Sequence, residues 1–280
     1  MVISLPLQCS VFLGAKTERF CSIFFYLAKD LLAKITKHCV KFTDVDFLNF
    51  LFMALIVIEG LDGAGKSTQI DILTNKLKDK AIPSHFLHFP RVDAPFFGEL
   101  IARFLRGDLG AIDRVDPYVV ALLYALDRMD AAPVIRQWLN GKHVVLLDRY
   151  VYSNVAFQCA KLDSNDQIIR LREWILKLEF EYYAIPKPDL NIFLDVPLEF
   201  IRRRLTELRM GNSRDYLQGK EDIHEKDLSF QEKVRAIYLQ QQHYDPNFVV
   251  LDCADKRGQM LKPDVISSMI LNEIAKRNIF

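Results

Sequence analysis

The 280-residue chain has no apolar run that approaches the roughly 20 residues needed to span a bilayer. It also has no excess of one charge, because 37 Lys+Arg residues are balanced by 36 Asp+Glu residues. A protein that binds nucleic acid through its phosphates needs a clearly basic surface. Eleven Gly and eleven Pro are too few for a fibrous or low-complexity chain, and 50% hydrophobic residues suffice for a core. We therefore expect a soluble globular protein, with neither a membrane nor a nucleic acid as partner.

Cysteine is also sparse, and its spacing excludes two further classes of protein. The five cysteines lie far apart and form no C-x-x-C pair. A structural zinc site needs clustered ligands, and a disulfide framework needs dense pairs. The sequence predicts reduced thiols and a cytoplasmic location. The cysteines are Cys9, Cys21, Cys39, Cys159 and Cys253.

Residues 1–52 differ in character from the rest of the chain. They hold three of the five cysteines and clumped apolar residues, without the basic start or cleavage site of a secretory signal. Met53 is followed at once by the apolar run Ala54–Ile58. We interpret residues 1–52 as an N-terminal extension outside the fold, with Met53 as the native start and residues 53–280 as one domain. N-terminal sequencing of the native protein tests this interpretation.

Downstream of Met53, strand-like and helix-like segments alternate, which is typical of a parallel sheet covered by helices on both faces. We therefore expect a three-layer α/β fold with about five strands. The predicted strands cover residues 55–59, 85–89, 143–147, 191–194 and 248–251. The predicted helices cover residues 68–80, 96–106, 116–139, 166–182, 197–209, 230–241 and 263–276.

The segment Gly60–Ser67 reads GLDGAGKS and fits the phosphate-loop (P-loop) pattern G-x-x-x-x-G-K-[ST] between a predicted strand and a predicted helix. Glycines let backbone N–H groups close around phosphate oxygens, and a helix N-terminus favours an anion. Lys66 is expected to reach the β- and γ-phosphates, and Ser67 to ligate Mg²⁺. The sequence thus predicts a P-loop NTPase fold that binds ATP or GTP. The predicted phosphate-binding residues are Gly60, Asp62, Gly63, Ala64, Gly65, Lys66, Ser67 and Thr68.

A GTPase would carry an N-K-x-D motif for the base. Residues 75–78 read NKLK, which lacks the Asp and lies within a predicted helix. No signature of a transport ATPase is present either. A short P-loop chain of this kind suits a kinase that acts on a small molecule.

Four further clusters follow predicted strands, where a second substrate would bind. Two of them supply Arg91 and Arg149, which can grip a phosphate with paired N–H groups. Tyr124 and Arg128 are spaced i, i+4, so an aromatic ring and a guanidinium share one helix face. Asp148 ends an apolar strand and can hold Mg²⁺ or its waters. The fourth cluster is the charged stretch 209–225.

Taken together, these motifs resemble the thymidylate kinase (dTMP kinase) family, most closely its bacterial form, over residues 53–280. The likeness rests on their order and spacing. The matching motifs are GLDGAGKS at 60–67, FPR at 89–91, LLY at 122–124 with Arg128, DRY at 148–150, YSN at 152–154 with Phe157, PDL at 188–190, LDVP at 194–197 and DIHE at 222–225.

The resemblance implies roles for individual residues. Asp62, Arg91 and Arg149 would organise the phosphate of dTMP, with Phe89 beside them. Tyr124 would stack on thymine, where the family usually has Phe, and Arg128 would bond the thymine O4. The resemblance places Asn154 and Phe157 around the nucleoside, with Phe157 against the 2′ edge of the sugar. It also implies Asp148 as the acid near Mg²⁺, and a homodimer.

The chain departs from one branch of the family directly after the loop aspartate, where that branch has Arg and this chain has Gly63. Phosphoryl transfer needs positive charge near the γ-phosphate. We expect a lid over about residues 209–225 to supply it through Arg209 or, preferably, Arg214. Lys66, Arg149, Arg209 and Arg214 are therefore the predicted catalytic residues.

The sequence thus predicts ATP-dependent phosphorylation of dTMP to dTDP, a step of dTTP biosynthesis, with Mg²⁺ as cofactor. Two alternatives stay open. One is a P-loop kinase for a nucleoside or another nucleoside monophosphate. The other is a non-catalytic sensor that only binds ATP and dTMP.

Overall fold

The computed structural model of the chain describes residues 53–110, 114–209 and 228–280, except the side chains of 205–209. Five parallel strands form one sheet in the order β2-β3-β1-β4-β5. The prediction of an α/β fold with a parallel sheet of about five strands is confirmed. The strands are β1 (Ala54–Gly60), β2 (Ser84–His88), β3 (Val144–Asp148), β4 (Leu190–Asp195) and β5 (Phe248–Asp252).

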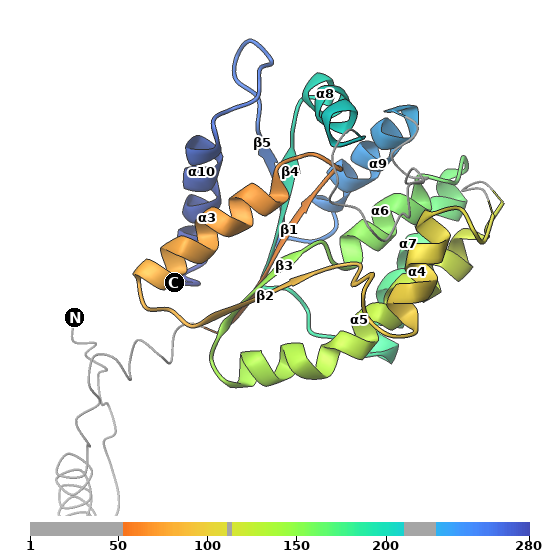
Figure 1. Cartoon of the computed structure of the whole chain (residues 1–280), viewed down its shortest axis with the longest axis horizontal. Helices are drawn as coiled ribbons and strands as arrows, with labels where there is room; N and C mark the ends of the chain where they lie inside the picture. Colours follow the sequence, from red (N-terminus) through yellow and green to blue (C-terminus); the bar gives the residue numbers. More distant parts are fainter. Residues whose placement is uncertain (1–52, 111–113, 210–227) are drawn as a thin grey trace, which may run out of the picture. The chain divides into compact units, whose positions relative to one another are not determined.

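Helices cover both faces of this sheet, as predicted (Figure 1). On one face, α3 (Lys66–Asp79) and α10 (Pro263–Lys276) pack against each other and against the strands. On the other face, α5 (Pro117–Asn140) contacts β3 and α6 (Val151–Cys159) contacts β1. The remaining helices are α4 (Phe97–Leu105), packed on α5; α7 (Asn165–Leu176) and α9 (Leu228–Gln241), both packed on α6; and α8 (Leu198–Arg209), which follows β4.

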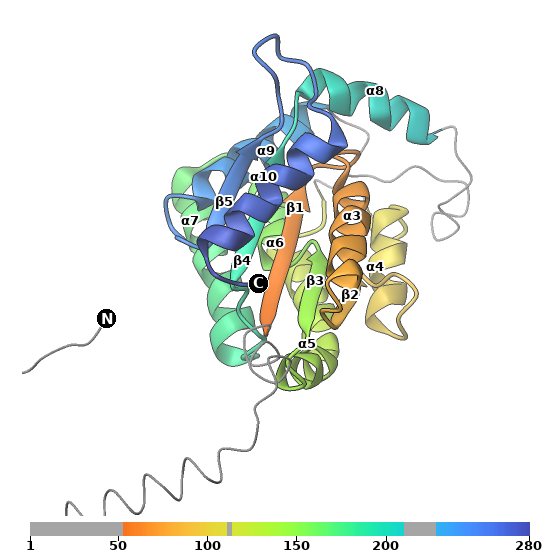
Figure 2. The ribbon, with the colours of Figure 1, turned by 90° about the vertical axis from the view of Figure 1, so that its left-hand side faces the viewer.

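The two strands at the centre of the site are buried along their whole length. All residues of β1 and β3 are inaccessible, because each strand has neighbours on both sides and helices on both faces. This explains why their sequences are continuous apolar runs rather than alternating ones. Figure 2 shows the P-loop running from the carboxyl end of β1 to the N-terminus of α3.

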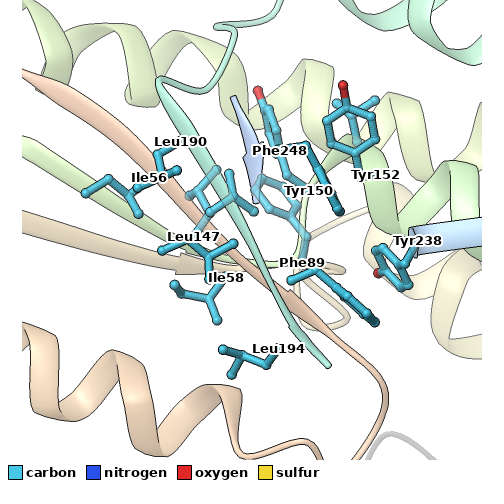
Figure 3. Close-up of a cluster of buried hydrophobic side chains, with 14 of the residues drawn as sticks. Ile56, Ile58, Phe89, Leu147, Tyr150, Tyr152, Leu190, Leu194, Tyr238 and Phe248 are labelled. Atoms are coloured by element: carbon cyan, nitrogen blue, oxygen red, sulfur yellow. The ribbon is translucent and has the colours of Figure 1, made fainter. Parts of the chain in front are cut away.

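An aromatic cluster joins the sheet to the helices that carry the site. The ring of Tyr238 on α9 stacks on Phe193 of β4 at a centroid distance of 4.5 Å. Tyr152 of α6 meets Phe248 of β5 edge-on at 4.9 Å. Figure 3 shows these tyrosines beside the aliphatic side chains of the strands. The cluster fixes α6 and α9 relative to strands β4 and β5.

The predicted helices are present, and one start signal is seen directly. Asp116 caps α5 by accepting a hydrogen bond from the backbone N–H of Tyr118 at 2.7 Å, and Pro117 follows in the first turn. A single helix was predicted over residues 166–182. In the structure it consists of α7 followed by a π-helical segment, η1 (Lys177–Tyr182).

Helix α6 is absent from the sequence prediction. It begins directly after the DRY motif and runs for nine residues, every one of them buried. A helix buried on all sides has no polar face, so its sequence lacks the 3.6-residue alternation by which amphipathic helices are recognised.

Three predictions fall wholly or partly outside the described residues. These are the extension 1–52, most of the lid at 209–225, and Arg214. Arg209 is the last residue of α8, and its side chain is not described. Among the residues that the structure does describe, no helix is both long enough and apolar enough to cross a bilayer.

Candidate active site

The P-loop connects β1 to α3, and two of its glycines adopt backbone conformations with positive φ. Gly63 and Gly65 have φ of 79° and 82°, in the left-handed region that side chains disfavour. At Gly60 a Cβ would lie 3.1 Å from the Cβ of Ala64 and 3.4 Å from the Lys66 Cγ, so a side chain there would press on the loop. The loop is therefore a tight turn of the kind whose N–H groups can surround phosphate oxygens, although the N–H of Ala64 donates to the Leu61 carbonyl at 3.2 Å.

Lys66 lies on the first turn of α3 and folds back over the loop. Its Nζ donates to the carbonyl oxygen of Leu61 at 3.1 Å and to that of Gly60 at 3.4 Å. Burial lowers its pKa, and the positive charge of Arg149 lowers it further. Ser67 and Thr68 are exposed at the N-terminus of α3, so both hydroxyls face solvent where a nucleotide would arrive.

Asp148 ends β3 beside the loop. Its carboxylate lies 3.9 Å from Lys66 Nζ and 3.2 Å from His88 Nδ1. Burial raises its pKa, but Lys66 and His88 outweigh burial, so the net shift is downward and the group is ionised at neutral pH. Its buried Oδ1 has no hydrogen-bond partner among the described residues. A charged oxygen without a donor is suited to a hard cation.

Arg149 follows Asp148 and has a φ of 67°, unusual for a residue with a side chain. Its Nη2 donates to Asp62 Oδ1 of the P-loop at 2.6 Å, and its guanidinium carbon lies 5.1 Å from the ring centre of Phe157. Burial lowers the pKa of Arg149, but Asp62 and other negative groups outweigh burial, and the net pKa is raised. The structure thus brings together three predicted residues, Asp62, Arg149 and Phe157, at the carboxyl edge of the sheet.

A buried carboxylate that the sequence analysis did not select supports this arginine. Glu59, in β1, accepts hydrogen bonds from the Ser153 hydroxyl at 2.6 Å and from the Tyr238 hydroxyl at 2.9 Å. Arg149 Nη1 donates to the same two hydroxyls, at 3.2 and 3.4 Å. Glu59 also accepts from the backbone N–H of Tyr150 at 2.9 Å. It therefore caps the N-terminus of α6 from a neighbouring strand.

Arg91 is held on α5 by two acidic side chains. Its Nε donates to Asp127 Oδ1 at 2.8 Å, and its Nη2 donates to Asp130 Oδ2 at 2.6 Å. Among the described residues nothing accepts from Nη1, so this nitrogen remains to meet a substrate. Phe89, which is buried, lies under Arg91 with its ring centre 6.0 Å from the guanidinium carbon.

Arg128 lies one helical turn after Tyr124 on α5, as the spacing predicted. It is buried and forms a bidentate ion pair with Glu179 of η1, at 2.5 and 2.8 Å. Burial lowers the pKa of Arg128, but Glu179 outweighs burial, and the net pKa is raised. Asn154 of α6 joins the pair, because its Nδ2 donates to Glu179 Oε1 at 3.0 Å. Tyr124 is half-buried.

Sequence reasoning missed three residues of this site, Glu59, Glu179 and Tyr238. Glu59 carried a usable signal, because it is a charged residue inside an otherwise apolar strand directly before the P-loop. Tyr238 lies among apolar residues at helical spacing, a pattern typical of core residues, and nothing in the sequence marks its hydroxyl for a second role. Glu179 lies in a helical pattern with other charged residues, and nothing in the sequence distinguishes it from a solvent-exposed acid.

Comparison with known proteins identifies the family of this chain. Residues 58–262 match the family model described as thymidylate kinase. The thymidylate kinase of Mycobacterium tuberculosis is 34% identical over 186 residues, which cover 66% of this chain and 84% of that protein. The probable thymidylate kinase of Thermococcus onnurineus is 33% identical over 228 residues, covering 79% of this chain and 99% of that protein.

A solved structure shows the same fold. The thymidylate kinase of Candida albicans superposes with a TM-score of 0.59 at 28% identity, covering 81% of this chain and 93% of that one. The family match includes the P-loop, the Arg149 cluster and the Arg128–Glu179 pair. This chain belongs to the thymidylate kinase family.

Proposed function

We infer that this chain transfers the γ-phosphoryl group of ATP to dTMP, giving dTDP and ADP, a step in dTTP biosynthesis. Family membership supports the activity. The observation that carries it in the structure is the 2.6 Å bond between Arg149 and Asp62, which joins the acceptor-side arginine to the P-loop itself. A donor phosphate in the loop and an acceptor phosphate on Arg149 would therefore be neighbours.

The residues contribute positioning and charge rather than covalent chemistry. Backbone N–H groups of the P-loop would bind the donor phosphates, with Lys66 turning from the loop carbonyls toward them. Arg149 and the remaining nitrogen of Arg91 would hold the acceptor phosphate. That phosphate is already largely ionised near neutral pH, so no general base is required.

On the base side, Tyr124 would stack on thymine, and Arg128 and Asn154 would bond its edge. Phe157 would lie against the sugar. We propose Arg214, or Arg209, as the lid arginine that approaches ATP.

Mg²⁺ is the cofactor that these residues fit. The Ser67 hydroxyl and the carboxylate of Asp148 are hard oxygen ligands, and Oδ1 of Asp148 has no donor in the described part of the chain. No group of three or more His, Cys, Asp or Glu residues could hold a metal within the described ranges. This agrees with a cation that binds through one or two protein oxygens and substrate phosphates. Bound there, Mg²⁺ would neutralise the charge that develops on the transferred phosphate.

We further propose that the chain is a homodimer and acts in the cytoplasm. The helices on the α5 side expose several apolar side chains, which a second copy would cover. They are Leu100 on α4, Val119 and Leu122 on α5, and Ile169 on α7. The two described cysteines, Cys159 and Cys253, are buried and free, as expected in a reducing compartment.

The activity is tested by measuring ADP formation from ATP-Mg with dTMP, dUMP, AMP, CMP or thymidine as acceptor. We expect rapid turnover with dTMP, and turnover about 100- to 1,000-fold slower in Lys66→Met, which loses the charge aimed at the transferred group. Preference for another acceptor would contradict the proposed substrate. Binding of ATP and dTMP without steady turnover would show a sensor instead of an enzyme.

A further inference from the structure

Glu179 is a buried carboxylate that binds two of the residues around the proposed base site. Its side chain is inaccessible, and it accepts Nε and Nη2 of Arg128 and Nδ2 of Asn154. Its partners come from α5 and α6, and it lies itself on the π-helical segment η1. Such segments are rare and frequently occur at functional sites.

Because a carboxylate and a backbone carbonyl only accept hydrogen bonds, Glu179 and the carbonyl of Ala121 together decide which way the amide of Asn154 points. The nitrogen must face Glu179, and its second hydrogen is taken by the backbone carbonyl of Ala121 at 2.9 Å. The amide oxygen is therefore turned away from both acceptors. Asn154 is 3% exposed, and its Oδ1 meets no donor among the described residues. A buried acceptor without a donor can be satisfied by a water molecule or by an N–H group of a ligand.

Glu179 also leaves one nitrogen of Arg128 unused. Nε and Nη2 are committed to the carboxylate, and nothing in the described part of the chain accepts from Nη1. Glu179 thus leaves an acceptor on Asn154 and a donor on Arg128. Thymine has a matching edge, with an N3–H donor beside the O4 acceptor. Cytosine has the reverse, an N3 acceptor beside an N4 amino donor.

We propose that Glu179 is a positioning residue that fixes the hydrogen-bond polarity of the base site and so makes it reject cytosine. This inference rests on the proposed function, since it takes dTMP as the acceptor. Glu179 acts through Asn154 and Arg128 and need not touch the substrate. With an amide at position 179, Asn154 would have a donor to face, and it could turn over at the loss of its bond to the Ala121 carbonyl and offer its nitrogen to N3 of cytosine.

The test compares the dissociation constants of dTMP and dCMP, measured by calorimetry without ATP, for the full chain and its variants. We expect Glu179→Gln to lower the preference for dTMP over dCMP by about 10-fold or more, because only the Ala121 carbonyl then orients the Asn154 amide. Glu179→Asp keeps an acceptor-only group, so both ligands should bind more weakly while the preference stays. Glu181→Gln, an exposed acid on the same segment, is the matched control and should change neither constant.

An unchanged preference in Glu179→Gln would overturn the proposal, as would an equal loss of preference in Glu179→Asp. If Glu179→Gln does not fold, Asn154→Ala leaves the Arg128 ion pair intact and should also lose the preference about 10-fold. A retained preference in that variant would overturn the proposal. Wild-type protein that binds dCMP as tightly as dTMP overturns it as well. Protein that prefers dTMP but forms no ADP contradicts the proposed function and leaves this inference standing.

Discussion

At the residue scale, several buried ionisable groups of the described residues lie beside an opposite charge, whereas Lys161 does not. Arg128, Arg149 and Asp148 each face an opposite charge. Lys161, just after α6, has a buried Nζ with no hydrogen-bond partner among the described residues, and this atom lies 5.0 Å from the ring centre of Phe104. Burial lowers the pKa of Lys161 to about 7. The paired charges belong to the candidate active site. The burial of Lys161 lowers the free energy of unfolding when the lysine is protonated.

The cost of Lys161 predicts a pH dependence of stability. Between pH 7 and about 10 the unfolded chain keeps the proton on this lysine and the folded chain gives it up, so the free energy of unfolding should rise with pH. Lys161→Met should remove that part of the rise and should stabilise the protein at pH 7 by about 1–3 kcal/mol. Urea denaturation at several pH values measures both effects.

Lys78→Met, at an exposed site on α3, is the control and should leave the pH profile unchanged. If Lys161→Met is less stable than the wild type, the lysine has a stabilising partner.

At the element scale, three elements meet at the hydroxyl groups that hold Arg149. Glu59 belongs to β1, Ser153 to α6 and Tyr238 to α9, and the arginine bonds both hydroxyls. The arrangement fixes the guanidinium through hydrogen bonds within the protein. Because Tyr238 belongs to α9, the packing of α9 also influences Arg149 on the proposed acceptor side of the site.

We predict that Ser153→Ala and Tyr238→Phe each raise the KM for dTMP about 3- to 10-fold, because each removes one hydrogen bond from Arg149. The KM for ATP should stay unchanged. Steady-state kinetics with each substrate varied in turn measures the split. Tyr152→Phe is the control on α6, since its hydroxyl bonds Asp245 at 2.7 Å and not Arg149. A parallel rise in both KM values, or the same effect in the control, would show a general loss of structure.

At the scale of the whole molecule, the exposed apolar side chains of α4, α5 and α7 bear on the oligomeric state. Val119 is 60% exposed and Leu122 is 37% exposed, one helical turn apart on α5. Both lie early in α5, the helix that later presents Arg128. Association of two copies through this face would also hold the base-side helices in place.

We predict that Val119→Glu converts a dimer to a monomer, because a charge would be buried without a partner in the interface. Sedimentation equilibrium gives the mass of each form, and circular dichroism shows whether the fold persists. Val265→Glu, at an exposed apolar site on α10, is the control and should leave the mass unchanged. A wild-type protein that sediments as a monomer would contradict the proposed dimer.

Much of the molecule could be predicted from local sequence. Buried strands alternating with helices predicted the parallel sheet, and the spacing of residues 60–67 predicted the loop between β1 and α3, because both depend on neighbouring residues. The Asp116 cap of α5 is local in the same way. Helix α6 could not be found by periodicity, since all of its faces are buried. Residues 1–52 remain a predicted extension.

The sequence by itself determined the fold class and the P-loop, and it supplied the candidate residues for the two proposed phosphate sites. Only the tertiary structure decided what those residues bond to. Glu59 and Glu179 come from segments distant in sequence, and they fix Arg149, Arg128 and Asn154 through contacts between elements. Motifs record residue types at short spacing, whereas the direction of a hydrogen bond depends on which groups the folded chain brings within about 3 Å.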